Sequence, residues 1–101
     1  MNTMDTNGAG GIDLNGTNVT LDGGVTTTGG GPVQVTNSGL LDIAPAGDMN
    51  LDGLFLQDGT GPVQTAGDIT TTNDNITFTT GVTLTDNGTV ALNTGAGAGD
   101  I

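Results

Sequence analysis

The chain has 101 residues, enough for one domain at most, and Gly, Thr, Asp and Asn fill 61 of these positions. Lys, Arg, His, Cys and Glu are absent, so eleven aspartates give the chain a formal net charge of −11. This composition excludes disulfide bonds and the usual zinc, haem and iron–sulfur sites, and it argues against nucleic-acid binding because nothing can neutralise phosphate groups.

The apolar content is low, with Val, Ile, Leu and Phe totalling 23 residues. Full burial of one such side chain contributes roughly 1.5–3 kcal/mol, whereas ordering each residue costs about 1.5 kcal/mol. A stable fold therefore needs nearly every apolar side chain buried and nearly every backbone group in a hydrogen-bonded ladder. Gly, Thr, Asn and Asp are weak helix formers, so we expect the ladder to be a β-sheet. No apolar run is long enough for membrane insertion, which needs about 18 residues.

Short apolar-x-apolar or apolar-x-Thr segments follow one another along the chain, separated by Gly, Asn and Asp. In chain order they begin at Ile12, Val19, Val25, Val33, Leu41, Met49, Leu54, Val63, Ile69, Ile76, Val82 and Val90. The mean step of about seven residues fits a very short strand followed by a turn. We expect the stretches 1–11 and 94–100 to fray.

Every third segment can be stacked into a column. The three columns are Ile12, Val33, Leu54 and Ile76; Val19, Leu41, Val63 and Val82; and Val25, Met49, Ile69 and Val90. Within a column the segments lie about 21 residues apart, which predicts a three-sided coil that repeats four times. The residue between two inward positions points outward. Phe55 is the one large apolar residue at these outward positions. Either it is a contact residue on a flat outer face, or the strand phase slips at Gly53 and Phe55 packs inside near Phe78.

The connecting residues suit tight corners, because Gly, Asn and Asp accept positive φ or cap a turn with a side chain. One coil cannot bury its inner face alone, so stacking must supply the stability. The sequence therefore predicts an all-β fold, a parallel β-helix or β-solenoid of about four three-sided coils of roughly 21 residues. Residues 1–101 form a single segment of it.

The stretch GDITTTNDNITFTTGVTLTDNGTVALNTGAGAGDI at 67–101 resembles the repeat region of filamentous-haemagglutinin-type giant bacterial surface proteins. The likeness extends over nearly the whole chain and carries no catalytic or binding motif. The resemblance implies that the solenoid is a right-handed parallel β-helix. It also implies a fragment of a longer repeat array, exported to the cell surface as a structural or adhesin-like stalk without catalysis. Its partners would be neighbouring coils of the same longer chain or head-to-tail copies, and a host-surface or matrix glycan or protein.

Calcium is the metal that this composition favours, because Asp, Asn and backbone carbonyls are oxygen ligands. Asp48 and Asp68 each precede a third-column strand, one coil apart, and Asp22 and Asp86 lie near the same edge. The sequence thus makes Asp48 and Asp68 a candidate calcium site, in a calcium-stabilised matrix or surface-layer solenoid. The alternative interpretation is that these aspartates are solvated turn residues that bond nearby amides.

A carbohydrate-active enzyme is a third hypothesis, since two aspartates could act as acid and base. The outward Asp13 and Asp42 fall in different columns, and no basic residue is present for lyase chemistry. Rows of outward threonine could also order water as ice-binding proteins do, but Asn50 and Asp52 interrupt the third-column row. We therefore expect no catalytic residues.

Overall fold

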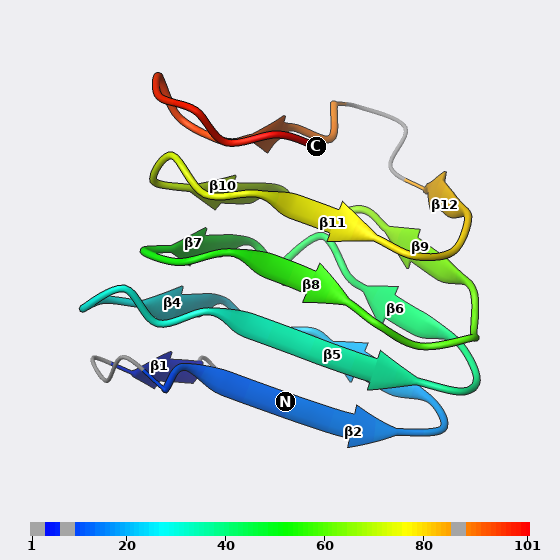
Figure 1. Ribbon diagram of the computed structural model, residues 1–101. Coiled ribbons are helices and arrows are strands. Elements are labelled where there is room, and N and C mark those ends of the chain that lie inside the picture. The colour runs from blue at the N-terminus through cyan, green and yellow to red at the C-terminus, as the bar shows by residue number, and fades with distance from the viewer. Residues whose placement is uncertain (1–3, 7–9, 86–88) are drawn as a thin grey trace.

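The computed structural model describes residues 4–6, 10–85 and 89–101, and these form thirteen strands and no helix. The strands build three parallel sheets (Figure 1). Sheet A contains β1 (Met4–Thr6), β4 (Val25–Thr27), β7 (Met49–Leu51), β10 (Ile69–Thr71) and β13 (Leu92–Asn93). Sheet B contains β2 (Ile12–Gly16), β5 (Val33–Asn37), β8 (Phe55–Gln57) and β11 (Ile76–Phe78). Sheet C contains β3 (Val19–Leu21), β6 (Leu41–Ile43), β9 (Val63–Thr65) and β12 (Val82–Leu84).

The chain visits the three sheets in turn and rises by one strand with each circuit. In Figure 1 the sheet B strands run left to right in front, and the chain returns behind them before rising, so the coil is right-handed. Register partners in adjacent coils are 19 residues apart for Val63 and Val82, and 24 apart for Val25 and Met49. The predicted β-solenoid of about four coils is confirmed.

The core lies inside the coil and is filled by alternate residues of each strand. Sheet strands of three residues repeat a buried, partly buried, buried pattern, as in β6 and β9, because successive side chains point to opposite faces. The fully buried residues stack in columns over one another. The largest of them are Phe55, Leu21, Leu41, Ile43, Met49, Ile69 and Ile76. The first inward position of each strand therefore forms an apolar column, whereas the second inward position also includes buried polar side chains such as Gln57 and Thr65. No single coil could form such columns.

The predicted position of Leu54 in the first column is wrong, because Phe55 pairs with both Val33 and Ile76. Phe55 is 0% exposed and Leu54 is 41% exposed. The strand phase slips at Gly53, whose missing side chain lets it pack against the backbone of Gly30 and Gly31. The slip buries the Phe55 ring against that of Phe78, with ring centroids 5.3 Å apart.

The predicted position of Val90 in the third column is also wrong, because Ile69 pairs with Leu92. The Ile69 amide donates to the Ala91 carbonyl oxygen at 2.9 Å, which fixes this register. The last corner is therefore two residues longer than the pattern suggests. Part of that corner, residues 86–88, lies outside the described residues.

The expectation that both terminal stretches fray is wrong for the residues described. Met4–Thr6 forms strand β1, which pairs in parallel with β4. At the other end the Asn73 amide donates to the Thr94 carbonyl at 2.9 Å, and the Ile76 amide donates to the Asp100 carbonyl at 2.8 Å. Residues of both stretches therefore join the ladder of the coils.

Candidate functional site

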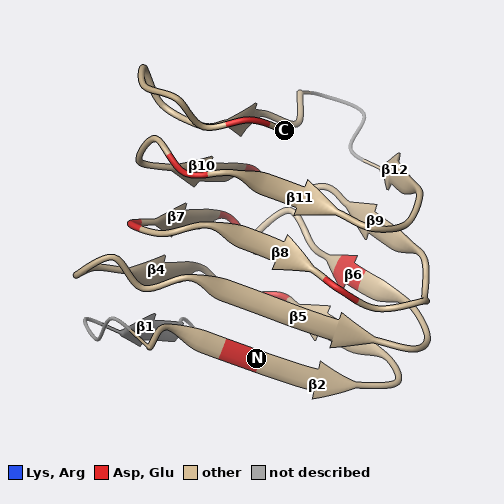
Figure 2. Cartoon of the chain, viewed as in Figure 1, with Lys and Arg blue, Asp and Glu red and all other residues tan. Residues whose placement is uncertain are grey.

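Threonine, asparagine, glutamine and aspartate dominate the outward positions of the three sheets. In sheet A, Thr26, Asn50, Thr70 and Asn93 lie in register, one per coil. The equivalent rows are Asp13, Gln34, Leu56 and Thr77 in sheet B, and Thr20, Asp42, Gln64 and Thr83 in sheet C. Figure 2 marks the aspartate positions in red on strands and corners, and the sequence contains no Lys, Arg or Glu. The outer surface thus offers hydroxyl, amide and carboxylate groups of one charge sign.

Asp48 and Asp68 occupy equivalent places at the corner that leads into sheet A. The Asp68 amide donates to Oδ1 of Asp48 at 2.8 Å, and the Ala91 amide donates to Oδ1 of Asp68 at 2.8 Å. Each carboxylate therefore caps the backbone of the coil that follows it in the chain. The turn-residue interpretation predicted such hydrogen bonds from nearby backbone amides to the two carboxylates.

The structure places this predicted pair in adjacent coils, where the Asp48 carboxylate accepts from the backbone amide of Asp68 and the Asp68 carboxylate accepts from Ala91. Among the described residues no group of three or more Asp, Glu, His or Cys side chains is arranged to hold a metal ion. Asp86 lies outside the described residues, and Asp22 is exposed. Calcium binding at Asp48 and Asp68 stays a prediction.

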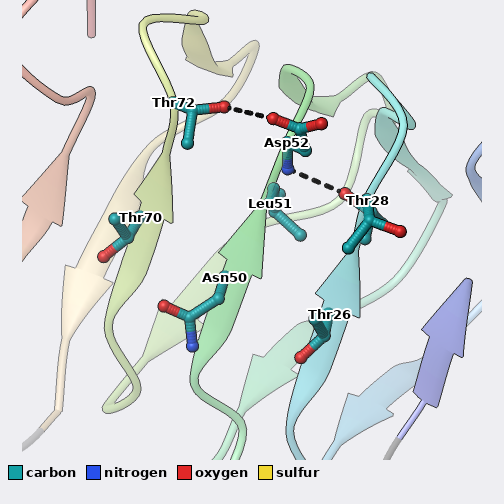
Figure 3. A pocket seen from close by; sticks show the side chains of 8 residues that line it. Thr26, Thr28, Asn50, Leu51, Asp52, Thr70 and Thr72 are labelled. Carbon is teal, nitrogen blue, oxygen red and sulfur yellow. Dashed lines mark hydrogen bonds between the residues drawn. The ribbon is translucent and has the colours of Figure 1, made fainter. Parts of the chain in front are cut away.

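A shallow groove of about 410 Å³ runs across the outer face of sheet A, at the ends of β4, β7 and β10. Each coil contributes one pair of polar side chains to the wall of the groove, as Figure 3 shows. The lining residues are Thr26, Thr27, Thr28, Asn50, Leu51, Asp52, Thr70 and Thr72. We refer to this feature as the Asp52 groove.

Asp52 lies at the centre of the Asp52 groove and connects three coils. Its carboxylate accepts a hydrogen bond from the Thr72 hydroxyl at 2.8 Å and one from the Gly30 amide at 2.9 Å. Its own amide donates to Oγ1 of Thr27 at 3.0 Å. The Thr72 hydroxyl and then the Gly30 amide lower the pKa of Asp52 below its usual value, because both stabilise the charged form.

The Asp52 groove presents hydroxyl, amide and carboxylate groups that can form hydrogen bonds with polar molecules. Glycoside hydrolysis needs a pair of carboxyl groups flanking the bond, and only one carboxylate lines this groove. Asp13 and Asp42, the outward aspartates considered for catalysis, lie on sheets B and C respectively. The structure does not bring them together on one face.

Sequence reasoning identified the threonine pairs of the groove but not the role of Asp52. A signal was present, because Thr28, Asp52 and Thr72 each directly follow a sheet A strand in consecutive coils. A side chain at that place can reach the coil above and the coil below. The row is mixed in chemistry, as expected, with Asn50 between Thr26 and Thr70.

Comparison with known proteins adds no relative, since no family model, no curated protein and no solved structure matches the chain. Within the part of the chain that the structure describes, no helix is long and apolar enough to cross a membrane. Any function must therefore be argued from the geometry alone.

Proposed function

We propose that the chain is a structural module, a stiff acidic stalk segment of an exported, adhesin-like bacterial surface protein. The observation that carries the proposal is the unbroken ladder of three parallel sheets, in which every coil repeats the hydrogen bonds of the one before it. Such a stack is extended by repetition, at about 4.8 Å per coil. A spacer needs this property and needs no catalytic centre.

The outer surface supports the same proposal. Apart from Leu54, Leu84 and Ile101, the large exposed side chains of the described residues are polar, and every side-chain charge is negative, which keeps neighbouring molecules apart and the surface hydrated. The buried apolar side chains of the described residues form one hydrophobic cluster. The proposed role therefore uses the whole outer face as a hydrated spacer, with contacts to a host or matrix glycan or protein as a further expectation.

Surface display can be tested on the source organism. Antibodies raised against the purified chain should label intact cells, and brief protease treatment of intact cells should remove that label. A cytosolic protein serves as the control and should be labelled only after permeabilisation. If the antibodies bind only permeabilised cells, the proposed surface role is wrong.

A calcium-stabilised solenoid is the second candidate, favoured by the placement of Asp48 and Asp68 at one corner in successive coils. On this hypothesis, millimolar calcium should raise the melting temperature above that in chelator, and magnesium should do so less. The double variant Asp48→Asn, Asp68→Asn should lose the shift, whereas the control Asp13→Asn should keep it. Equal melting temperatures with calcium and with chelator would dismiss this candidate.

A further inference from the structure

One backbone hydrogen bond recurs at the start of every sheet B strand. The backbone amide of the first inward residue donates to a carbonyl oxygen in the next coil. That carbonyl belongs to the residue just before the donor's register partner. The pairs are Ile12 to Pro32 at 2.8 Å, Val33 to Leu54 at 2.9 Å and Phe55 to Asn75 at 2.9 Å. The residues that follow these carbonyls are Val33, Phe55 and Ile76, which are the inward residues of the next strand. The bond therefore marks where a sheet B strand begins.

The same bond occurs once more, above the last complete sheet B strand. The Ile76 amide donates to the Asp100 carbonyl at 2.8 Å. A second bond, from the Asp100 amide to Oδ1 of Asn75 at 2.9 Å, holds this segment over the corner below. By the recurring geometry, Ile101 occupies the first inward position of a fifth strand in sheet B. It is 69% exposed, whereas Ile76 beneath it is 1% exposed.

The neighbouring edge of sheet C is uncovered in the same way. Leu84 is an inward residue of β12, yet it is 56% exposed, whereas Ile43 in the same column is 0% exposed. Val82 and Phe78 are only partly buried against the core. This end of the described coils thus carries four incompletely buried apolar side chains, those of Phe78, Val82, Leu84 and Ile101, and we call it the upper face.

The backbone of the upper face has a defined polarity. The Thr79 and Thr85 amides donate downward, to the carbonyls of Gln57 and Thr65. In a parallel ladder alternate residues bond to opposite neighbours. The amides of Phe78, Val82 and Leu84 therefore point upward like that of Ile76, toward the side on which neither β11 nor β12 has a further described strand.

We propose that the upper face is an assembly surface that accepts one further coil of this chain's own repeat pattern, its sheet B strand beginning at the position of Ile101 and its sheet C strand pairing with β12. The inference deepens the proposed structural function, on which it rests, by naming the partner of the stack. The occupant is an apolar-x-apolar strand, a corner and a second such strand.

A second copy of the whole chain, stacked end to end on the upper face, fits less well than a single added coil. The first strand of a copy, β1, belongs to sheet A, and β13 already fills the sheet A level beside Ile101. A copy placed on β13 would leave sheets B and C one strand short at that level. A single added coil covers Phe78, Val82 and Leu84 together.

The test extends the chain by one of its own coils. Residues 1–100 are followed by a second copy of residues 33–53, whose first two strands are Val-Gln-Val and Leu-Asp-Ile, so that a valine takes the place of Ile101. The control extension has the same composition, but in each strand an inward apolar residue is exchanged with its outward neighbour. Amide hydrogen exchange is measured by NMR for the unextended chain and for both extended chains.

The amides of Phe78, Val82 and Leu84 should exchange at least tenfold more slowly in the extended chain. The downward-facing amides of Thr77 and Thr83 should change less, and the control extension should slow none of them comparably. Equal exchange in the extended and unextended chains, or equal slowing by the control, would overturn the proposal. Concentration-dependent dimers of the unextended chain that protect the same three amides would instead identify a second copy as the occupant. Cell-surface labelling does not depend on any of these results.

Discussion

Buried amide side chains connect successive coils at the corner between sheets B and C. Gln57 and Asn37 are both 0% exposed, and Nε2 of Gln57 donates to Oδ1 of Asn37 at 2.8 Å. Oε1 of Gln57 accepts from the Thr79 amide at 2.9 Å. Gln57 thus bonds one coil through each end of its amide, and no buried side-chain polar atom among the described residues lacks a partner. Such a network is stable only when complete.

Replacing Gln57 should therefore cost more than its size suggests. In Gln57→Ala, Asn37 loses a buried donor, and the Thr79 amide loses its 2.9 Å side-chain acceptor and keeps only the 3.2 Å bond to the backbone carbonyl of residue 57. We therefore expect the free energy of unfolding to fall by about 2–4 kcal/mol. The control Gln64→Ala removes the same side chain from an outward position and should change it by less than about 0.5 kcal/mol. Urea unfolding followed by circular dichroism measures both. Equal losses in the two variants would show that the network is not stabilising.

The lowered pKa of Asp52 predicts a pH-dependent contribution to stability. Because its carboxylate accepts bonds from Thr72 and Gly30 only in the folded state, the folded pKa lies below the unfolded value of about 3.9. The contribution is therefore complete above about pH 4 and is lost as the pH falls through the folded pKa.

The measurement is the difference in unfolding free energy between the unmodified chain and Asp52→Asn, taken from pH 7 down to pH 2. We expect this difference to be constant above about pH 4 and to shrink below it. The control Asp42→Asn corrects for the general loss of negative charge. A difference that grows as the pH falls would contradict the assigned bonds.

The corners, rather than the strands, determine how many residues each coil contains. At some corners two backbones touch with no room for a side chain: a Cβ at Gly61 would lie 1.7 Å from the Gly39 carbonyl oxygen. Elsewhere residues are added, as at Ala44–Gly47, where the Gly47 amide closes a turn on the Ala44 carbonyl at 2.8 Å. The turn has Pro45 at its second position, where a fixed φ is favourable. Three-residue strands between such corners tolerate changes in corner length.

Glycine at position 61 should accordingly be irreplaceable. Gly61→Ala forces the Gly39 backbone away from its ladder position, and we expect it to lower the free energy of unfolding by about 3 kcal/mol or more. Gly81→Ala is the matched control, because a Cβ there meets nothing within 4 Å. Urea midpoints compare the two variants. A Gly61→Ala chain as stable as Gly81→Ala would mean that the coils do not stack as described.

The sequence was sufficient to predict the sheets, because inward apolar residues recur wherever a strand must cover its neighbours. The whole second column, Val19, Leu41, Val63 and Val82, is in register as predicted. The phase at Phe55 could not be decided, since the pattern fits Leu54 or Phe55 equally and only packing against Phe78 distinguishes them. Leu92 was missed because corner length is set by backbone contacts that the hydrophobic pattern does not encode.

The candidate site was less predictable than the fold. The sequence indicated that Asp48 and Asp68 stand one coil apart, but an aspartate before a strand suits a metal ligand and a turn cap equally. Only the structure shows which amide each carboxylate accepts from. The centre of the Asp52 groove depends on three coils at once, and no local motif records that arrangement.

At the scale of the molecule, the stability of the fold depends both on the uniformly negative side-chain charge and on the repetition of the coils. All eleven charges are negative, so ion pairs between side chains contribute nothing to stability. Stability must come from the apolar columns and the ladder, and repulsion among aspartates opposes it. A module of this kind is stabilised by each coil added to the stack, because every interior coil is covered on both sides.

The most direct test of the account is whether hydrogen bonds join residues about 21 positions apart. Scalar couplings across hydrogen bonds, measured by NMR on the isotope-labelled chain, identify each donor and acceptor pair. We predict couplings from the Val19 amide to the Leu40 carbonyl, from Leu41 to Pro62, and from Val63 to Gly81. Couplings that instead join each of these segments to its sequence neighbour, as in antiparallel hairpins, would contradict the solenoid and the structural role proposed from it.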